Sequence, residues 1–263
     1  MASILFSTLL ISLLINALFF VIAFKLQTDK FTDITYSLSF IFIAFFIYSF
    51  SNKKGFQTIG IMLVIIWALR LGGFLLYRVV RNGRDSRFDG MRESFSRFAK
   101  FWLNQAIVAW ALMIPASIAF STNKSSSLNY IALLGVIVWI IGLIIESTAD
   151  IQKFNFRLDP NNVNKWIDTG IWRYSRHPNY FGEMLIWAGI YLYVLPNLSF
   201  IERIIGLVSP VLIVLLLRYG SGVPILEKSA DNKWGKNPGY MAYKKNTNLL
   251  IPFFNIRKEE KTK

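Results

Sequence analysis

Hydrophobic and polar positions follow one another along this chain in long blocks. Seven blocks are mainly apolar and are predicted to span a membrane as helices, since a helix rises about 1.5 Å per residue and the hydrocarbon core is about 30 Å thick. The pattern predicts an all-α, polytopic membrane helix bundle with about seven transmembrane helices, and residues 1–263 form a single membrane domain. The predicted spans are Ser3–Phe24, Ile34–Phe50, Thr58–Val80, Trp102–Phe120, Leu128–Ile145, Tyr180–Leu195 and Ile201–Leu217.

The polar connections between these spans differ in charge. The segments Arg81–Lys100 and Lys153–Arg176 and the C-terminal tail are rich in Lys and Arg, whereas the connections after the fourth and sixth spans hold few basic residues. Because basic connections stay in the cytoplasm, we expect the N-terminus outside and the C-terminal tail in the cytoplasm. No basic residue precedes the first span, and Lys25 and Lys30 follow it, which favours an uncleaved helix over a secretory signal.

The end of the connection Arg81–Lys100 has its own pattern. Met91, Phe95 and Phe98 are spaced so that they share one face of a helix whose other positions are polar or basic. This amphipathic pattern predicts a short helix lying in the membrane interface before the fourth span.

Composition agrees with the hydrophobic pattern and excludes several classes of site. Hydrophobic residues make up 54% of the chain, and the formal net charge is +14. The basic residues lie between apolar runs, which indicates cytoplasmic loops rather than binding of nucleic acid. The chain has no cysteine and one histidine, so we expect no disulfide, no thiol nucleophile and no metal site.

The segment Trp172–Glu183, WRYSRHPNYFGE, gathers polar chemistry where the sixth span begins. An ionisable residue in a membrane helix is costly and is therefore a hypothesis of function. The start of a helix also offers free N–H groups to an anion. Two structural alternatives stay open, namely that His177 is only a structural hydrogen-bonding residue and that Glu183 is only an ion-pair partner for Arg173 or Arg176.

A second polar group lies at the end of the fifth span. Glu146, Asp150, Lys153 and Arg157 are four, three and four residues apart, which places them on one face of a helix that continues beyond the span. The structural alternative is a salt-bridged helix end facing solvent. With the motif Trp172–Glu183, these residues can form one cytoplasmic pocket for a nucleotide-bearing ligand, although no P-loop, dinucleotide-binding glycine fingerprint or hydrolase elbow is present in the sequence.

The run GIWRYSRHPNYFGE, the tail EKSADNKW and the later YMAYKKNTNLLIPF resemble the DUF1295 branch of the steroid 5-alpha-reductase-like superfamily of membrane proteins. The resemblance extends over about Leu128–Phe254, and FLLYRVVRNGR, which ends at Arg84, is similar to a basic cofactor-side loop of those enzymes. It implies that the chain binds NADPH. The cofactor-binding residues that it implies are Arg84, Asp150, Arg157, Arg173, Arg176, His177, Asn179, Tyr180, Glu183 and Tyr243.

The same resemblance implies different roles for successive regions of the chain. Residues 1–127 would form substrate-side helices, residues 128–254 the cofactor-binding region and residues 255–263 a polar tail. The chain lacks the Gln-Glu pair of steroid reductases and has Arg70 where their tyrosine would fall, so Tyr77 and Arg70 are the catalytic candidates. The expected reaction is reduction of a C=C bond in a hydrophobic lipid substrate that enters from the bilayer. The resemblance places the protein in the endoplasmic reticulum membrane or the bacterial inner membrane.

An alternative reaction shares the same motif. The RHP-x-Y-x-G core also occurs in membrane methyltransferases of the isoprenylcysteine and phospholipid type, where it helps to bind S-adenosylmethionine. Their tails likewise carry acidic residues and a tyrosine motif, as do Glu227 and the segment Tyr240–Pro252. The NYFGE run and the pair Asp150 and Arg157 favour the reductase, and a non-catalytic membrane scaffold is a third hypothesis.

Overall fold

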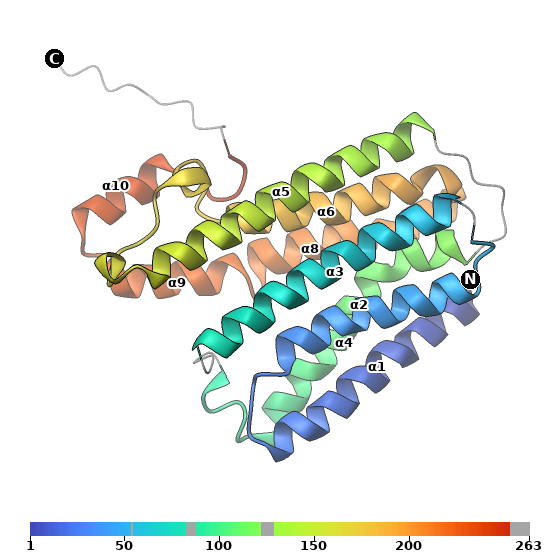
Figure 1. Cartoon of the computed structure of the whole chain (residues 1–263), viewed down its shortest axis with the longest axis horizontal. Coiled ribbons are helices and arrows are strands. Elements are labelled where there is room, and N and C mark those ends of the chain that lie inside the picture. The colour runs from blue at the N-terminus through green and yellow to red at the C-terminus, as the bar shows by residue number, and fades with distance from the viewer. Residues whose placement is uncertain (54, 83–87, 122–128, 253–263) are drawn as a thin grey trace. The chain divides into compact units, whose positions relative to one another are not determined.

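The computed structural model describes residues 1–53, 55–82, 88–121 and 129–252 (Figure 1). The described residues form helices and connecting loops, and the one β-type pairing among them is an isolated parallel bridge between Ser175 and Asn248. The all-α class predicted from the hydrophobic pattern is therefore confirmed. The helices are α1 (Ala2–Lys25), α2 (Thr32–Ser49), α3 (Gly55–Asn82), α4 (Phe95–Phe120), α5 (Tyr130–Leu158), α6 (Pro178–Val194), α7 (Phe200–Gly206), α8 (Val208–Tyr219), α9 (Val223–Trp234) and α10 (Pro238–Asn246).

Six helical stretches in the described part of the chain are long and apolar enough to cross a membrane, judged by length and composition. They are α1, α2, α3, α4, α5 and the stretch Phe200–Trp234 that contains α7 to α9. The multi-pass class is thus supported. The remaining predicted span corresponds to α6, which has 17 residues. The count of seven spans and the orientation in the membrane stay predictions.

The chain forms two compact units. Unit 1 contains residues Met1–Ile137 and Trp187–Leu212, and unit 2 contains Val138–Ile186 and Ile213–Lys263. The boundary between them falls within α5, α6 and α8.

Unit 1 contains α1 to α4, which Figure 1 shows running alongside one another. Helix α1 packs against α2 and α4, and α2 packs against α3 and α4. Buried polar side chains join these helices: Asn16 on α1 donates to Ser39 on α2 and accepts from Gln105 on α4. Hydrogen bonds of this kind hold helices together in lipid, where hydrophobic burial between helices contributes little.

The start of α4 corrects one prediction about the preceding connection. A separate interfacial helix was expected there, but Phe95 is the first residue of α4, and the helix runs without a break to Phe120. Phe98 and Trp102 are buried and lie one turn apart, and both rings contact Phe20 on α1. The prediction was wrong because the apolar face that looked interfacial packs against α1.

Unit 2 contains most of α5, the first turns of α6, and α9 and α10. Helix α5 continues to Leu158, so the sequence ESTADIQKFNFR is helical as predicted. Helices α5 and α6 approach each other through glycine: a Cβ atom built on Gly142 would lie 2.7 Å from the carbonyl oxygen of Gly182. That distance leaves no room for a side chain, so the two backbones are in direct contact.

Candidate functional site

The motif Trp172–Glu183 is anchored on α5 through Trp172. The indole ring is buried, and its Nε1 donates to the carbonyl oxygen of Ala149 at 3.0 Å. The Nζ atom of Lys153, also on α5, lies 4.6 Å from the centroid of the ring, in a cation–π contact. Just before the motif, the backbone N–H of Ile171 donates to Gln152 at 3.0 Å. The polar face of α5 therefore positions the start of the motif.

The C-terminal tail holds the motif from another direction. The backbone N–H of Arg176 donates to the carbonyl oxygen of Asn248 at 2.8 Å. The hydroxyl of Ser175 donates to the carbonyl oxygen of Leu250 at 2.7 Å. The Ser175 hydroxyl also accepts from the backbone N–H of His177 at 3.2 Å. Tyr243 on α10 donates its hydroxyl to the carbonyl oxygen of Trp172 at 2.8 Å. These bonds involve the backbone of the motif, so its conformation depends on the tail.

Glu227 on α9 is the acceptor on which three basic side chains converge. Its Oε2 atom lies 2.7 Å from Nη1 of Arg176 and 3.4 Å from Nζ of Lys244. Its Oε1 atom lies 2.8 Å from Nε2 of His177. Asp231, one turn further along α9, binds Lys244 as well. The arrangement joins the Arg-His pair of the motif to both tail helices.

Two polar atoms of this cluster are buried without a hydrogen-bond partner in the part of the chain that the structure describes. They are Nε of Arg176 and Nδ1 of His177. Burial lowers the pKa of His177, and the hydrogen bond that its ring donates to Glu227 opposes that shift. The His177 ring stacks on Tyr180, with 5.6 Å between ring centroids and 12° between planes. Two adjacent residues thus each have a buried nitrogen that is open to a hydrogen bond with a ligand.

A basic pocket of about 510 Å³ opens beside this cluster. Lys244 and Lys245 at the end of α10 line it together with Arg176, and Met241 and Ala242 supply its apolar wall. Three basic side chains around one pocket suit an anionic group. Arg176 and Lys244 already contact Glu227, so the pocket presents cations that are held in place by a carboxylate.

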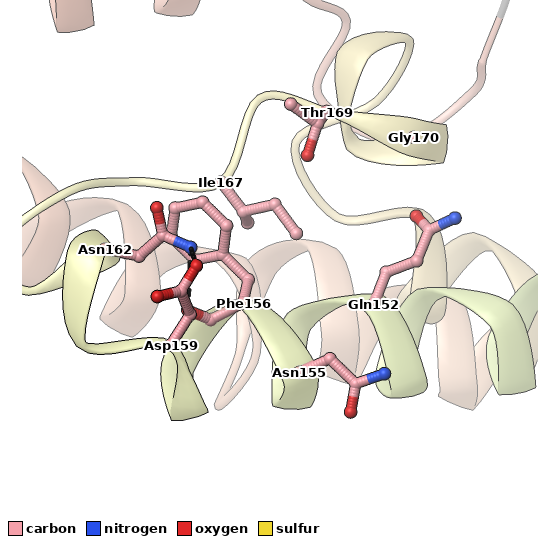
Figure 2. A pocket seen from close by; sticks show the side chains of 8 residues that line it. All are labelled: Gln152, Asn155, Phe156, Asp159, Asn162, Ile167, Thr169 and Gly170. Atoms are coloured by element: carbon pink, nitrogen blue, oxygen red, sulfur yellow. Dashed lines mark hydrogen bonds between the residues drawn. The ribbon is translucent and has the colours of Figure 1, made fainter.

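A second pocket, of about 410 Å³, is lined mainly by amide, hydroxyl and carboxyl groups (Figure 2). Figure 2 shows Asn162 donating to the carboxylate of Asp159, a contact of 3.3 Å. Gly170, with φ of 59°, adopts a left-handed conformation that favours glycine, and the Gln152 amide lies against it. The lining residues are Gln152, Asn155, Phe156, Asp159, Asn162, Ile167, Thr169 and Gly170.

Unit 2 contains nine of the ten residues predicted to bind the cofactor. Asp150 and Arg157 lie on α5, and Asn179, Tyr180 and Glu183 lie on the first turns of α6. The remaining four, Arg173, Arg176, His177 and Tyr243, lie in the motif and on α10. Arg84 lies outside the described residues.

The two catalytic candidates lie on α3 in unit 1. The Tyr77 ring is half exposed and has the guanidinium of Arg81 5.6 Å from its centroid. The guanidinium of Arg70 lies 5.7 Å from the ring centroid of Phe74. Within the described ranges, no group of three or more His, Asp or Glu side chains is arranged to hold a metal ion. The roles of Tyr77 and Arg70 stay predictions.

Several residues of the candidate site were not among the predicted ones. Glu227 and Lys244 are central to it, and Gln152 and Ser175 fix the backbone of the motif. Gln152 is detectable in the sequence, because it lies about one turn before Asn155 on α5, and Asp159 follows directly after the end of that helix. The pairing of Glu227 with the motif joins residues 50 positions apart, and spacing along the chain gives no signal for it.

One comparison with known proteins identifies a family, and that family has no described function. A family model described as a protein of unknown function (DUF1295) matches residues 19–247. A protein of Schizosaccharomyces pombe (strain 972 / ATCC 24843), described as uncharacterized, is 24% identical over 198 residues, which cover 64% of this chain and 56% of that relative. The chain thus spans little more than half the length of that relative. No solved structure matches.

Proposed function

This chain belongs to the DUF1295 family, and from that premise we propose that it is a membrane oxidoreductase that uses NADPH to reduce a C=C bond of a lipid or steroid-like substrate. The observation that carries the proposal is the basic pocket formed by Arg176, Lys244 and Lys245. It is built from the motif and the tail, the two segments in which the resemblance to membrane reductases lies. The protein is proposed to lie in the endoplasmic reticulum membrane or the bacterial inner membrane.

The charge of this pocket favours NADPH over S-adenosylmethionine. NADPH carries several phosphate groups, whereas S-adenosylmethionine carries none and has a positive sulfonium. Guanidinium and ammonium groups bind phosphate through charge-assisted hydrogen bonds. The buried Nε of Arg176, which has no partner in the described part of the chain, is a further donor for a phosphate or carbonyl oxygen. The donor set therefore fits an anionic dinucleotide.

The second pocket supplies complementary chemistry. The amide groups of Gln152 and Asn155 can donate to and accept from sugar hydroxyls or the edge of a purine base, and the carboxylate of Asp159 can accept from them. Unit 2 thus offers a basic pocket for the phosphates of a nucleotide and a second pocket for its uncharged polar groups.

The reaction would divide between a cofactor and side chains of this chain. Bound NADPH supplies a hydride. Arg176, Lys244 and Lys245 would hold its phosphates, and Glu227 would keep Arg176 in place by accepting from its Nη1 atom. A substrate with a conjugated carbonyl develops negative charge on its oxygen, and a positioned donor stabilises that oxygen. Tyr77 and Arg70 are the proposed donors, since each carries N–H or O–H groups on a helix with exposed apolar side chains.

The alternative is an S-adenosylmethionine-dependent methyltransferase. The observation that favours it is the convergence of Arg176 and His177 on Glu227, because the RHP core and an acidic tail residue are shared with those enzymes. In that case an acidic or aromatic environment would receive the sulfonium, and no hydride would be transferred.

A binding experiment separates the two functions. The purified protein in detergent is titrated with NADPH, S-adenosylmethionine and S-adenosylhomocysteine while its thermal stability is followed. A ligand at one hundred times its Kd adds about 2.7 kcal/mol to the free energy of unfolding. We expect stabilisation by NADPH. Stabilisation by S-adenosylmethionine or S-adenosylhomocysteine alone overturns the reductase proposal.

Matched lysine variants test the pocket itself. Lys245→Ala removes a cation that lines the pocket, and Lys236→Ala removes an exposed lysine that does not. We expect Lys245→Ala to weaken NADPH binding by about 0.5–1 kcal/mol, which is roughly two- to fivefold in Kd, because the contact is partly exposed. Equal effects of the two variants would show that the pocket does not hold the phosphates.

The predicted cofactor residues on α6 are tested in the same assay. Asn179→Ala and Glu183→Ala should lose the stabilisation by NADPH while each variant elutes as a folded protein in detergent. NADPH binding retained in both variants overturns their assignment to the site.

A further inference from the structure

The two nitrogen atoms of the His177 ring lie in different surroundings. Nε2 lies 2.8 Å from Oε1 of Glu227, and a carboxylate can only accept a hydrogen bond. Nε2 must therefore carry a proton. Nδ1 is buried and has no partner among the residues that the structure describes. A neutral imidazole has one N–H and one bare nitrogen, so Nδ1 is left as an acceptor.

The surroundings of the ring keep it neutral. The His177 side chain is 6% exposed, and its burial is the largest influence on its pKa, which lies below the ordinary value although the Glu227 contact opposes that shift. The charged groups that act on the ring are Glu227, Lys153 and Arg176, and the two cations add to the effect of burial.

An unpaired buried acceptor is costly to keep. Leaving such a group without a partner costs about 1–3 kcal/mol, so few are found in folded proteins. Arg176, the adjacent residue, leaves its buried Nε donor unpaired as well. A neighbouring donor and acceptor without partners match a ligand group that both accepts and donates, such as a carboxamide or a hydroxyl.

We propose that Glu227 fixes the Nε2–H tautomer of His177, so that Nδ1 accepts a hydrogen bond from a carboxamide or hydroxyl group of the bound ligand. Glu227 is then a positioning residue that acts through His177, and His177 is a neutral acceptor rather than an anion-binding cation. The identity of the ligand, NADPH, rests on the proposed function. The tautomer rests on the contact with Glu227 and on the burial of the ring, and it does not depend on which ligand binds.

The tautomer can be measured directly, because His177 is the only histidine of the chain. Full-length protein labelled with ¹⁵N-histidine and purified in detergent should give one pair of ring-nitrogen signals in the NMR spectrum. At neutral pH we expect Nε2 to be protonated and Nδ1 to be bare. A spectrum of the Nδ1–H tautomer, or one averaged between the two tautomers, overturns the assignment.

The isosteric variant Glu227→Gln gives a sharper test. Arg176 only donates, so the amide carbonyl must face Arg176 and the amide NH₂ must face Nε2 of His177. The NH₂ then donates to Nε2, and the ring should change to the Nδ1–H tautomer. NADPH binding should weaken about tenfold, since one buried hydrogen bond to the ligand is lost. A Glu227→Gln variant that folds and keeps the Nε2–H tautomer contradicts the proposal.

Asp231→Asn is the matched control for the change in charge. Asp231 lies one turn further along α9, and its carboxylate contacts Lys244 and Tyr240. This variant loses the same charge and should keep the Nε2–H tautomer. A change of tautomer in Asp231→Asn would show that net charge, rather than the contact of Glu227, sets it. If Glu227→Gln fails to fold, the spectrum of the unaltered protein still decides the tautomer.

Addition of ligand tests the acceptor role. NADPH binding is followed by its own fluorescence, and the Nδ1 signal of the same sample should shift when a donor reaches it. Bound NADPH with an unchanged Nδ1 signal overturns this inference and leaves the cofactor site intact. Failure of NADPH to bind overturns the proposed function instead. S-adenosylhomocysteine is then added, and a signal that responds to neither ligand overturns the acceptor role.

Discussion

Gly182 on α6 and Glu146 on α5 meet backbone to backbone: a Cβ atom at Gly182 would lie 2.6 Å from the backbone nitrogen of Glu146. Gly182 is the glycine of the NYFGE run, with Asn179 and Glu183 beside it on α6. Glu146 is buried and begins the charged face of α5 that continues to Asp150. The glycine therefore lets the polar start of α6 approach the polar end of α5, which a larger residue would prevent.

Replacement of this glycine should disturb the candidate site. Gly182→Ala forces backbone to move against backbone, and overpacking of this kind costs about 1–3 kcal/mol. We expect a lower melting temperature and weaker NADPH binding. Gly73→Ala on α3 is the control, because nothing lies within 4 Å of a Cβ atom there and the alanine should be neutral or slightly stabilising. Similar melting temperatures for both variants would contradict the close contact.

Much of this architecture could be predicted from the sequence, because in lipid the backbone N–H and C=O groups form their hydrogen bonds mainly within helices. The extension of α5 to Leu158 followed from the spacing of Asp150, Lys153 and Arg157. The short interfacial helix was wrong because periodicity identifies an apolar face without identifying what covers it. Phe98 faces α1, and this contact depends on the tertiary fold.

The candidate site was predictable in part. Residues of the motif Trp172–Glu183 were visible as ionisable groups at the start of a membrane helix. Glu227 was not placed, because its contact with His177 joins α9 to the motif across 50 positions and leaves no periodic pattern. Likewise, the sequence gives no signal for Ser175, whose hydroxyl binds the tail. Contacts between distant segments depend on where the tertiary fold brings the tail back to the motif, and local sequence patterns do not specify this.

The tail should stabilise the motif through Tyr243. Its hydroxyl donates to the carbonyl oxygen of Trp172, and Tyr243→Phe removes this bond while keeping the ring. We expect a loss of about 1 kcal/mol in the free energy of unfolding, the typical net value of one hydrogen bond. Tyr219→Phe, at an exposed tyrosine on α8, should change stability by less than about 0.5 kcal/mol. Thermal unfolding of both variants in detergent compares them, and equal losses would refute the role of the hydroxyl.

Unit 1 should depend on the ion pair between Arg92 and Asp29. The Arg92 Nη1 atom lies 2.5 Å from Oδ1 of Asp29, and Arg92 also binds Asp89. Asp29 is 2% exposed, so Arg92→Ala leaves a buried carboxylate without this cation and should cost about 3 kcal/mol or more. Arg97→Ala removes an exposed arginine of the next helix and serves as the control. If the two variants melt alike, the pair contributes no more than a surface charge.

Acid should destabilise the protein through His177. Burial lowers the pKa of this side chain in the folded protein below the ordinary value of 6.5. The unfolded chain therefore takes up a proton first as the pH falls, and the free energy of unfolding decreases below about pH 6.5 until the folded protein is protonated as well. Above that pH the contribution is fully present. Because the chain has one histidine, few other side chains titrate in this window.

The pH dependence can be assigned with one variant. His177→Gln keeps a donor toward Glu227 and cannot titrate, so its melting temperature should fall less than that of the unaltered protein between about pH 7.5 and about pH 5.5. Carboxylates titrate in both proteins and cancel in the comparison. Parallel curves for the two proteins would mean that His177 already has an ordinary pKa in the folded state, and that its ring is open to water rather than enclosed by Glu227, Tyr180 and the tail.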